Sequence, residues 1–365
     1  IRQIDWSIAW LLPLISLFLG FKGSFVRADG RAYIFLNYVF LSALYYYYLV
    51  DFHQPGATTP PWKQGLGTYF VPFLAFIVFA SYSFLGVRPI INNEFLETQK
   101  LIQAGPNAKS AYRDSAQETL RSTYRLDAEF LDRINRKKSI DIIPWDIALL
   151  YGYELLWEPR PVIQSYASYT AELDRLDAEF FRGSEAPEQL IMALSTIDHR
   201  SVVFDNPATF LALLDTYQYA FQSADGRYAL LKKRQESLFR DFVPITQKEY
   251  SFSEDILVPQ EPESHVFLSA EIEPSILGKF LNVFYKPTSL FIEMTLQNGE
   301  VRRNRYIRAT GQNGLFISKY IENLSDLEAV FNETYMQNVT SVRFVGNGSI
   351  YQEPFKVLFY KIPSR

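Results

Sequence analysis

Three cations and one acid lie close together near the N-terminus, in the stretch "FKGSFVRADGR". They are Lys22, Arg27, Asp29 and Arg31. An arginine guanidinium can hold two phosphate oxygens at once, and a lysine ammonium adds a point charge. The stretch therefore suggests a site for an anion such as a lipid phosphate, with Asp29 orienting an arginine or serving as a base. The alternative is topological, because lysine and arginine collect in the cytoplasmic loops of membrane proteins.

A second group of polar and aromatic side chains follows the expected strands of a parallel sheet. Ligands of open α/β sheets gather beyond the carboxyl ends of the strands, and aromatic rings there would suit the face of a sugar. The expected ligand crevice contains Trp145, Asp146, Arg160, Gln164, Tyr166, Tyr169, Asp198, His199 and Arg200. In the alternative, structural interpretation, Trp145 and Asp146 start a helix, and Arg160 pairs with Asp198.

Several kinds of chemistry have no residues to carry them. The 365 residues contain no cysteine, which excludes a thiolate nucleophile and cysteine metal sites. The three histidines (His53, His199 and His265) are far apart in the sequence. The glycine-rich motifs of nucleotide sites and the GxSxG motif of serine hydrolases do not occur. We therefore expect no metal and no cofactor, and catalytic residues stay unassigned.

Charge is unevenly distributed along the chain. Residues 1–88 hold six basic and three acidic residues, which leaves 30 basic and 37 acidic residues for the remainder. A nucleic-acid site needs a basic face that replaces the counterions of the phosphates. The acidic remainder therefore argues against nucleic acid as a partner.

Three apolar stretches have the dimensions of membrane spans. They cover residues 4–21, 32–50 and 68–87, and the last two reach the roughly 20 residues that cross a bilayer. Residues 1–88 are therefore expected to form three transmembrane helices, with membrane lipid as a partner. The lysines and arginines beside these stretches favour a cytoplasmic location for the rest of the chain.

The remaining sequence divides into three parts. Apolar residues recur every three or four positions in 89–138, which predicts a helical arm. In 139–242 strands alternate with helices, which predicts a Rossmann-like α/β domain with a mostly parallel sheet. In 243–365 the period changes to two, which predicts an all-β, jelly-roll-like sandwich. The expected fold class is thus a membrane α-helical part, an α/β domain and a C-terminal β-sandwich.

Local signals make this outline more specific. The strands expected in the α/β domain include "SIDII", "RPVIQSY" and "EQLIMAL". Glycines after Asp or Asn predict hairpins at Asp225-Gly226, Asn298-Gly299 and Asn347-Gly348. One helical insertion is expected near 325–332, inside the sandwich.

Three passages resemble the C-terminal part of a group of large bacterial polytopic membrane proteins without an assigned activity. The passages are "FKGSFVRADG", the run from "IDIIPWDIALL" to "STIDHR", and "YIRATGQNGLFISKYIENLSDLEAVF". Those proteins look similar to C-type membrane glycosyltransferases. The resemblance implies a bacterial inner membrane protein whose soluble domains are periplasmic. The acidic catalytic residues of that family usually lie in an early extracytoplasmic loop, which this sequence does not contain.

Two functions from different classes follow. The chain is either the C-terminal portion of a bacterial integral membrane protein whose accessory domains handle saccharides or lipid-linked saccharides, or a non-catalytic, membrane-anchored subunit. In the second case it braces a larger complex through other membrane subunits. An open crevice at the strand ends would favour the first.

Overall fold

The computed structural model describes residues 105–198, 200–239, 241–261, 264–285, 288–334 and 336–363, and also 15, 17–22, 39, 98–99 and 102. The chain divides into two compact units. Residues 1–112 with 284–286 form the first unit, and residues 113–283 with 287–365 form the second. The three sheets of the described residues belong to the second unit.

The membrane part of the expected fold class needs a correction. Among the residues that the structure describes, no helix has the length and the apolar content needed to cross a membrane. The longest of them, α5 (Gly105–Tyr124), has 20 residues, but its sequence is rich in polar side chains. The expected spans at 4–21, 32–50 and 68–87 fall outside the described residues, apart from a few positions in the first two.

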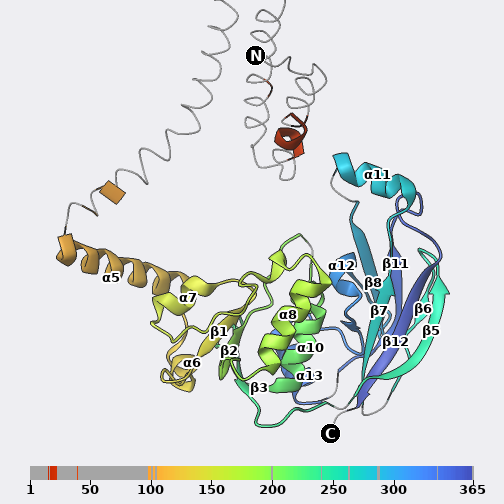
Figure 1. Ribbon diagram of the computed structural model, residues 1–365. Helices are drawn as coiled ribbons and strands as arrows, with labels where there is room; N and C mark the ends of the chain where they lie inside the picture. Colours follow the sequence, from red (N-terminus) through yellow and green to blue (C-terminus); the bar gives the residue numbers. More distant parts are fainter. Residues whose placement is uncertain are drawn as a thin grey trace, which may run out of the picture. The chain divides into compact units, whose positions relative to one another are not determined.

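A small mixed sheet stands where a mostly parallel sheet was expected (Figure 1). Its strands are β1 (Ile140–Ile143), β2 (Gln189–Met192), β3 (Tyr217–Gln222) and β4 (Ala229–Lys233), in the order β1-β2-β4-β3. Only β1 and β2 are parallel, whereas β4 is antiparallel to both β2 and β3. The predicted Rossmann-like domain with a mostly parallel sheet is therefore wrong.

The physical reason lies in the predicted strand "RPVIQSY", which does not form. Pro159 and Pro161 lack the N–H groups that a sheet ladder needs, and Arg160 between them is buried. The segment ends in a short 3-10 helix, η3 (Ser165–Ala167). As a result β1 pairs directly with β2, and the hairpin at Asp225-Gly226 adds β4 in the antiparallel direction.

Helices cover both faces of the mixed sheet. They are α6 (Ala128–Arg133), α7 (Ile147–Gly152), α8 (Ala171–Arg182), α9 (Val202–Asp205) and α10 (Pro207–Thr216). Side chains of α6 and α7 pack with Ile142 and Leu230 on one face. On the other face α8 and α10 lie between the mixed sheet and the two remaining sheets (Figure 1). The ring of Phe210 in α10 is 5.8 Å from that of Phe316, which lies across this layer.

Two antiparallel four-stranded sheets make up the C-terminal part of the chain. One has the order β10-β7-β12-β5 and the other β6-β11-β8-β9. Their strands are β5 (Val243–Tyr250), β6 (Ile256–Leu257), β7 (Ser264–Glu271), β8 (Leu290–Leu296), β9 (Val301–Tyr306), β10 (Leu315–Phe316), β11 (Val339–Val345) and β12 (Phe355–Pro363). The sheets face each other, since Phe344 of β11 meets Phe355 of β12 edge-on with ring centroids 5.4 Å apart.

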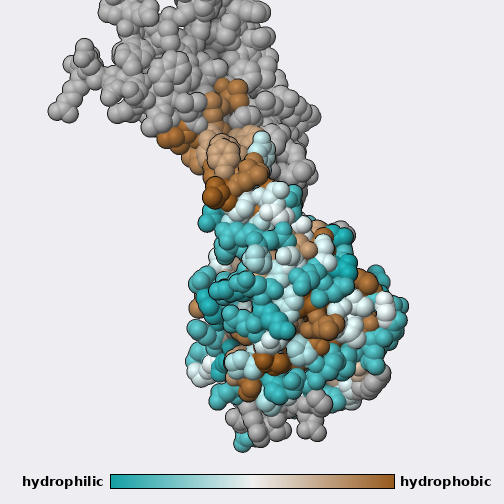
Figure 2. All heavy atoms as spheres, turned by 90° about the vertical axis from the view of Figure 1, so that its right-hand side faces the viewer, coloured by the Kyte–Doolittle hydropathy of each residue, from teal (hydrophilic) through white to brown (hydrophobic). Residues whose placement is uncertain are grey.

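Three helices accompany these sheets: α11 (Ile276–Phe284), α12 (Arg308–Gly311) and α13 (Leu324–Phe331). The helix α13 coincides with the insertion expected near 325–332, and a capping box of Asn323 and Asp326 starts it. The helix α11 exposes apolar side chains, among them Ile276, which is 89% exposed. Elsewhere the face of the second unit shown in Figure 2 is mostly hydrophilic, with apolar residues in small separate patches.

Candidate functional site

The predicted cluster near the N-terminus is described at one position only. Lys22 lies in the described part, with its ammonium 6.0 Å from the centroid of the Phe18 ring. Arg27, Asp29 and Arg31 lie outside the described residues. The anion site proposed from this cluster therefore stays a prediction.

Four residues of the predicted strand-end crevice come together in space. The Trp145 and Tyr166 rings meet edge-on, 5.6 Å apart. The Tyr166 hydroxyl donates to Gln164 Oε1 at 2.7 Å, and Arg200 Nη1 donates to the Tyr166 carbonyl at 3.3 Å. Tyr169 is 58% exposed. Local contacts thus join Trp145, Gln164, Tyr166 and Arg200, and Gln164 lies at the surface.

Asp198 and Asp146 have other surroundings. Asp198 pairs with Arg305 of β9, with 3.4 Å between Nη1 and Oδ2, so the predicted pair of Arg160 with Asp198 is wrong. His199 lies outside the described residues. Asp146 lines a separate pocket of about 380 Å³ at the carboxyl ends of β1 and β2.

Arg160 lies inside the protein and has a structural position. Its Nη1 atom is 2.7 Å from Asp141 Oδ2 and donates to the Ile142 carbonyl at 2.6 Å. Its Nη2 atom donates to the Pro144 carbonyl at 2.7 Å and to the Ile163 carbonyl at 2.6 Å. With so many acceptors fixed inside the protein, the guanidinium holds the segment after β1 in place and has no access to a ligand.

Two buried aspartates of α8 extend this polar interior. Asp177 accepts a hydrogen bond from Val162 N at 2.8 Å and lies 3.8 Å from Arg160 Nε. Burial raises the pKa of Asp177 to about 7, because the arginine is closer to Asp141 and compensates only part of the desolvation. The interior of the second unit therefore contains a carboxyl group, that of Asp177, whose pKa lies near neutral pH.

Asp174 ties α8 to α10 and to the loop before β10. Its carboxylate accepts hydrogen bonds from Ala208 N and Thr209 N, both at 3.0 Å, at the start of α10. It also accepts one from Asn313 Nδ2 at 2.8 Å. Asp174 therefore fixes the Asn313 side chain, which lines a pocket beside α8.

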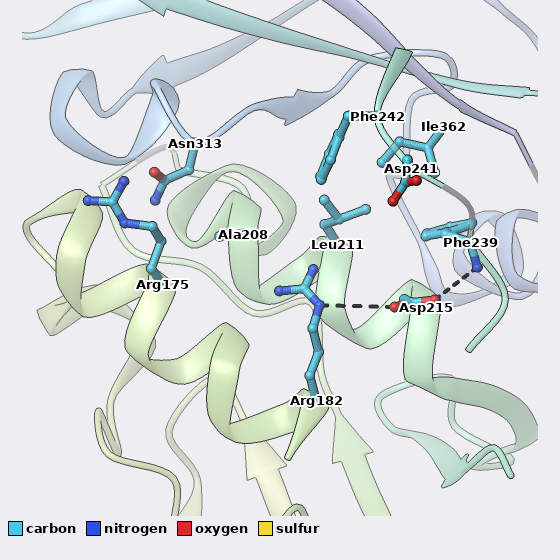
Figure 3. Close-up of a pocket in the computed structure, with 10 residues that line it drawn as sticks. All are labelled: Arg175, Arg182, Ala208, Leu211, Asp215, Phe239, Asp241, Phe242, Asn313 and Ile362. Atoms are coloured by element: carbon cyan, nitrogen blue, oxygen red, sulfur yellow. Dashed lines mark hydrogen bonds and ion pairs between the residues drawn. The ribbon is translucent and has the colours of Figure 1, made fainter. Parts of the chain in front are cut away.

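That pocket is an open groove of about 650 Å³ within the second unit (Figure 3). Its polar lining consists of Arg175, Arg182, Asp215, Asp241 and Asn313. Its apolar lining consists of Ala208, Leu211, Phe239, Phe242 and Ile362. These residues come from α8, α10, the connector after β4, the loop before β10, and β12. A volume of this size is typical of sites for small organic ligands.

The charged side chains of the groove are held in defined places. Asp215 Oδ1 accepts hydrogen bonds from Ser237 Oγ and from Phe239 N, the latter at 2.9 Å. Its Oδ2 lies 4.0 Å from Arg182 Nε, as Figure 3 shows. Burial lowers the pKa of Arg182. Arg175 precedes Arg182 by seven residues in α8, and its Nη2 atom is 3.1 Å from Glu172 Oε1.

An exposed aromatic ring completes the groove. Phe242 is 55% exposed, and its ring meets Tyr360 edge-on at 5.1 Å. In Figure 3 this ring stands over the groove and points toward Leu211. An apolar ring that is fixed in place but open to solvent can receive the flat apolar face of a ligand.

Nothing in the sequence drew attention to this groove. Its one sequence signal is the spacing of Arg175 and Arg182, since residues seven apart lie on the same face of a helix. Phe242, Asn313 and Asp215 come from unrelated segments. In the described ranges no group of three or more His, Cys, Asp or Glu side chains is placed to hold a metal ion.

Comparisons with known protein families, with curated proteins and with solved structures find no match to this chain. The geometry of the second unit is therefore the basis for a functional proposal.

Proposed function

We propose that the second unit binds a saccharide and that the groove beside α8 is its binding site. The proposal rests on one observation: the groove combines a fixed, exposed aromatic ring with planar polar side chains. Phe242 offers a surface for the C–H face of a sugar ring. The forked groups of Arg182 and Asp241 can each exchange two hydrogen bonds with neighbouring hydroxyls. Asn313 Nδ2 already donates to Ala171 and Asp174, so its Oδ1 atom is the acceptor left for a ligand.

The charge of the groove supports a neutral ligand. Its described lining contains two arginines, Arg175 and Arg182, and two aspartates, Asp215 and Asp241. A phosphate-rich or strongly acidic ligand would be attracted by the arginines and repelled by the aspartates at similar range. A neutral polyhydroxyl ligand can form hydrogen bonds to the arginines and to Asp241 without this conflict of charge.

The same geometry favours binding over hydrolysis. Glycoside hydrolysis usually needs two carboxyl groups that flank the scissile bond, one of which gives or takes a proton. Asp215 is engaged by Ser237, Phe239 and Arg182, so it acts as a positioning residue for the arginine. Asp241 is the exposed carboxylate of the groove. The proposal is therefore an accessory, non-catalytic binding unit.

A glycan array tests the proposal with the full-length chain. We expect the parent protein to retain a subset of neutral oligosaccharides. The Phe242→Ala variant should lose about fivefold in affinity for them, since the aromatic contact contributes about 1 kcal/mol. Tyr169→Ala is the matched control, because it removes an equally exposed ring outside the groove.

The control also separates the two sites. If Tyr169→Ala lowers saccharide binding and Phe242→Ala does not, the ligand binds at the predicted strand-end crevice and the groove is not the site. If no oligosaccharide is retained by the parent protein, the saccharide proposal fails, and a structural role without such a ligand takes its place.

A further inference from the structure

A second pocket lies at the carboxyl ends of the parallel strands β1 and β2. It has a volume of about 380 Å³, and its polar and aromatic lining consists of Asp146, Ser195, Arg227, Tyr228, Glu322 and Asn323. Ligands of α/β proteins commonly bind at this end of a parallel strand pair. The pocket shares no lining residue with the groove beside α8.

Asp146 is the distinctive residue of this pocket. It occupies the N-cap position of α7, where an aspartate usually accepts a hydrogen bond from the helix, yet its side chain makes no capping bond. It forms no hydrogen bond or ion pair with any described residue, and it lines the pocket instead. Burial raises its pKa above the usual range of an aspartate. A half-buried carboxylate kept without a partner is a cost to stability, and a ligand that pairs with it would remove that cost.

The other charged side chains in the described lining are already paired. Arg227 Nε is 2.5 Å from Asp225 Oδ2, and Arg227 Nη2 donates to the Tyr124 carbonyl at 2.6 Å. Glu322 Oε2 is 3.1 Å from Arg302 Nη2. Arg302 is shared with Glu300, so this group carries a net negative charge and the Arg227 pair is neutral. The carboxylate of the described lining that lacks an arginine partner is that of Asp146.

An anion is a poor occupant for a second reason. The helix α13 begins at the pocket, and a free helix N-terminus would attract an anion. Here its first N–H groups are used, because Asn323 Oδ1 accepts from Ser325 N and Asp326 N at 2.9 and 3.0 Å. Asp326 Oδ2 in turn accepts from Glu322 N at 2.9 Å. The capping box therefore already satisfies the N–H groups that an anion would bind.

The uncharged lining offers a further acceptor to a cation. Ser195, exposed beyond the carboxyl end of β2, adds a hydroxyl oxygen. Tyr228 forms a wall of the pocket, since it is almost fully buried and its ring lies 5.4 Å from the Arg227 guanidinium. We propose that this pocket binds a small organic cation, a primary ammonium or guanidinium compound, whose charged group pairs with Asp146.

The test uses agmatine as the probe and the full-length chain. Isothermal titration should show one site for agmatine, whereas butane-1,4-diol, which lacks the charges, should not bind. Asp146→Asn should lower the affinity for agmatine at least about tenfold, because a hydrogen bond to a charged group is lost. In the absence of agmatine the same variant should unfold at a higher temperature than the parent, since it removes an unpaired buried charge.

Asp198→Asn is the matched control, because it removes an exposed carboxylate that does not line the pocket. It should leave agmatine binding unchanged. The proposal is overturned if Asp146→Asn binds agmatine as the parent does, if Asp198→Asn loses as much affinity, or if butane-1,4-diol binds equally well. Groove variants such as Phe242→Ala should have no effect, so this result is independent of the saccharide proposal.

Discussion

Arg160 and Asp141 form an ion pair in the interior of the second unit, with 2.7 Å between Nη1 and Oδ2 and both side chains only 1% exposed. Trp157 Nε1 donates to the second oxygen of Asp141 at 2.9 Å. The pair links β1 to the segment that replaces the expected second strand. Loss of this ion pair should therefore lower the stability of the fold, and we expect no direct effect on a binding site.

We predict that Arg160→Met lowers the free energy of unfolding by about 3–5 kcal/mol, because it leaves the buried Asp141 charge without its cationic partner. Urea unfolding of the full-length chain measures this change. Arg175→Ala is the control for loss of an arginine at the surface, and it should change stability by no more than about 0.5 kcal/mol. Equal midpoints for Arg160→Met and the parent would contradict a structural role for the pair.

Asp174 should couple stability to the shape of the groove. Asp174→Ala leaves the N–H groups of Ala208 and Thr209 without their acceptor and removes one of the two acceptors of Asn313 Nδ2. Buried donors without partners cost about 1–3 kcal/mol each, so we expect a loss of at least about 2 kcal/mol in urea unfolding. Thr170→Ala removes an exposed cap of the same helix and should cost only about 1 kcal/mol. A smaller loss for Asp174→Ala than for Thr170→Ala would contradict this role.

The buried carboxyls predict an unusual dependence of stability on pH. Burial raises the pKa of Asp177 to about 7 and that of Asp205 to about 6, both above the 3.8 of a solvated aspartate. Between about pH 4 and 7 the folded chain therefore binds more protons than the unfolded chain, and these two groups lower stability as the pH rises. Asp177→Asn removes one of the two titrations.

Urea unfolding between pH 4 and 8 measures this effect as a difference between variant and parent. We expect Asp177→Asn to gain stability relative to the parent as the pH rises from 4 to 7, and the gain to level off above that range. A difference that stays constant over the whole range would show that Asp177 does not titrate as described.

Two glycines in left-handed backbone conformations form a matched pair. Gly299 has φ +85°, and a Cβ there would meet nothing within 4 Å. Gly314 has φ +97°, and a Cβ there would overlap the hydroxyl of Tyr360, which supports Phe242. In both alanine variants the positive φ lowers the free energy of unfolding by about 1 kcal/mol. Only Gly314→Ala adds a loss of about 1–3 kcal/mol from overpacking.

Thermal unfolding and saccharide binding of the two glycine variants separate these contributions. Gly314→Ala should be the less stable variant and should also bind saccharide more weakly, because Tyr360 must move. Gly299→Ala should retain the binding of the parent. If both variants bind alike, Tyr360 does not set the position of Phe242.

Local turn chemistry was the part of the fold that sequence predicted well. The hairpins at Asp225-Gly226 and Asn298-Gly299 are confirmed, because each glycine adopts the positive φ that a tight turn needs. The third, at Asn347-Gly348, is wrong. There the N–H groups of Ile350 and Tyr351 donate to the Asn347 carbonyl, and Tyr351 pairs with Pro274 instead of β11.

Features that depend on distant contacts were not predictable. The direction of the mixed sheet is not evident from the sequence because Arg160 reads as an ordinary polar residue, although it donates to five acceptors within the fold. The groove was missed because Arg182, Asp215, Phe242 and Asn313 carry no common spacing. The sequence places Asp146 after a predicted strand, and the structure puts it in a pocket at that strand end.

Hydrogen exchange of the full-length chain, with and without a saccharide that it retains, tests the central claim most directly. Saccharide in the groove should slow amide exchange in the connector at Phe239, Asp241 and Phe242 and in the loop at Asn313, while Ser195 and Tyr228 of the strand-end pocket stay unchanged. Slower exchange at Ser195 and Tyr228 with no change at Phe242 would contradict the proposal that the groove beside α8 is the saccharide site.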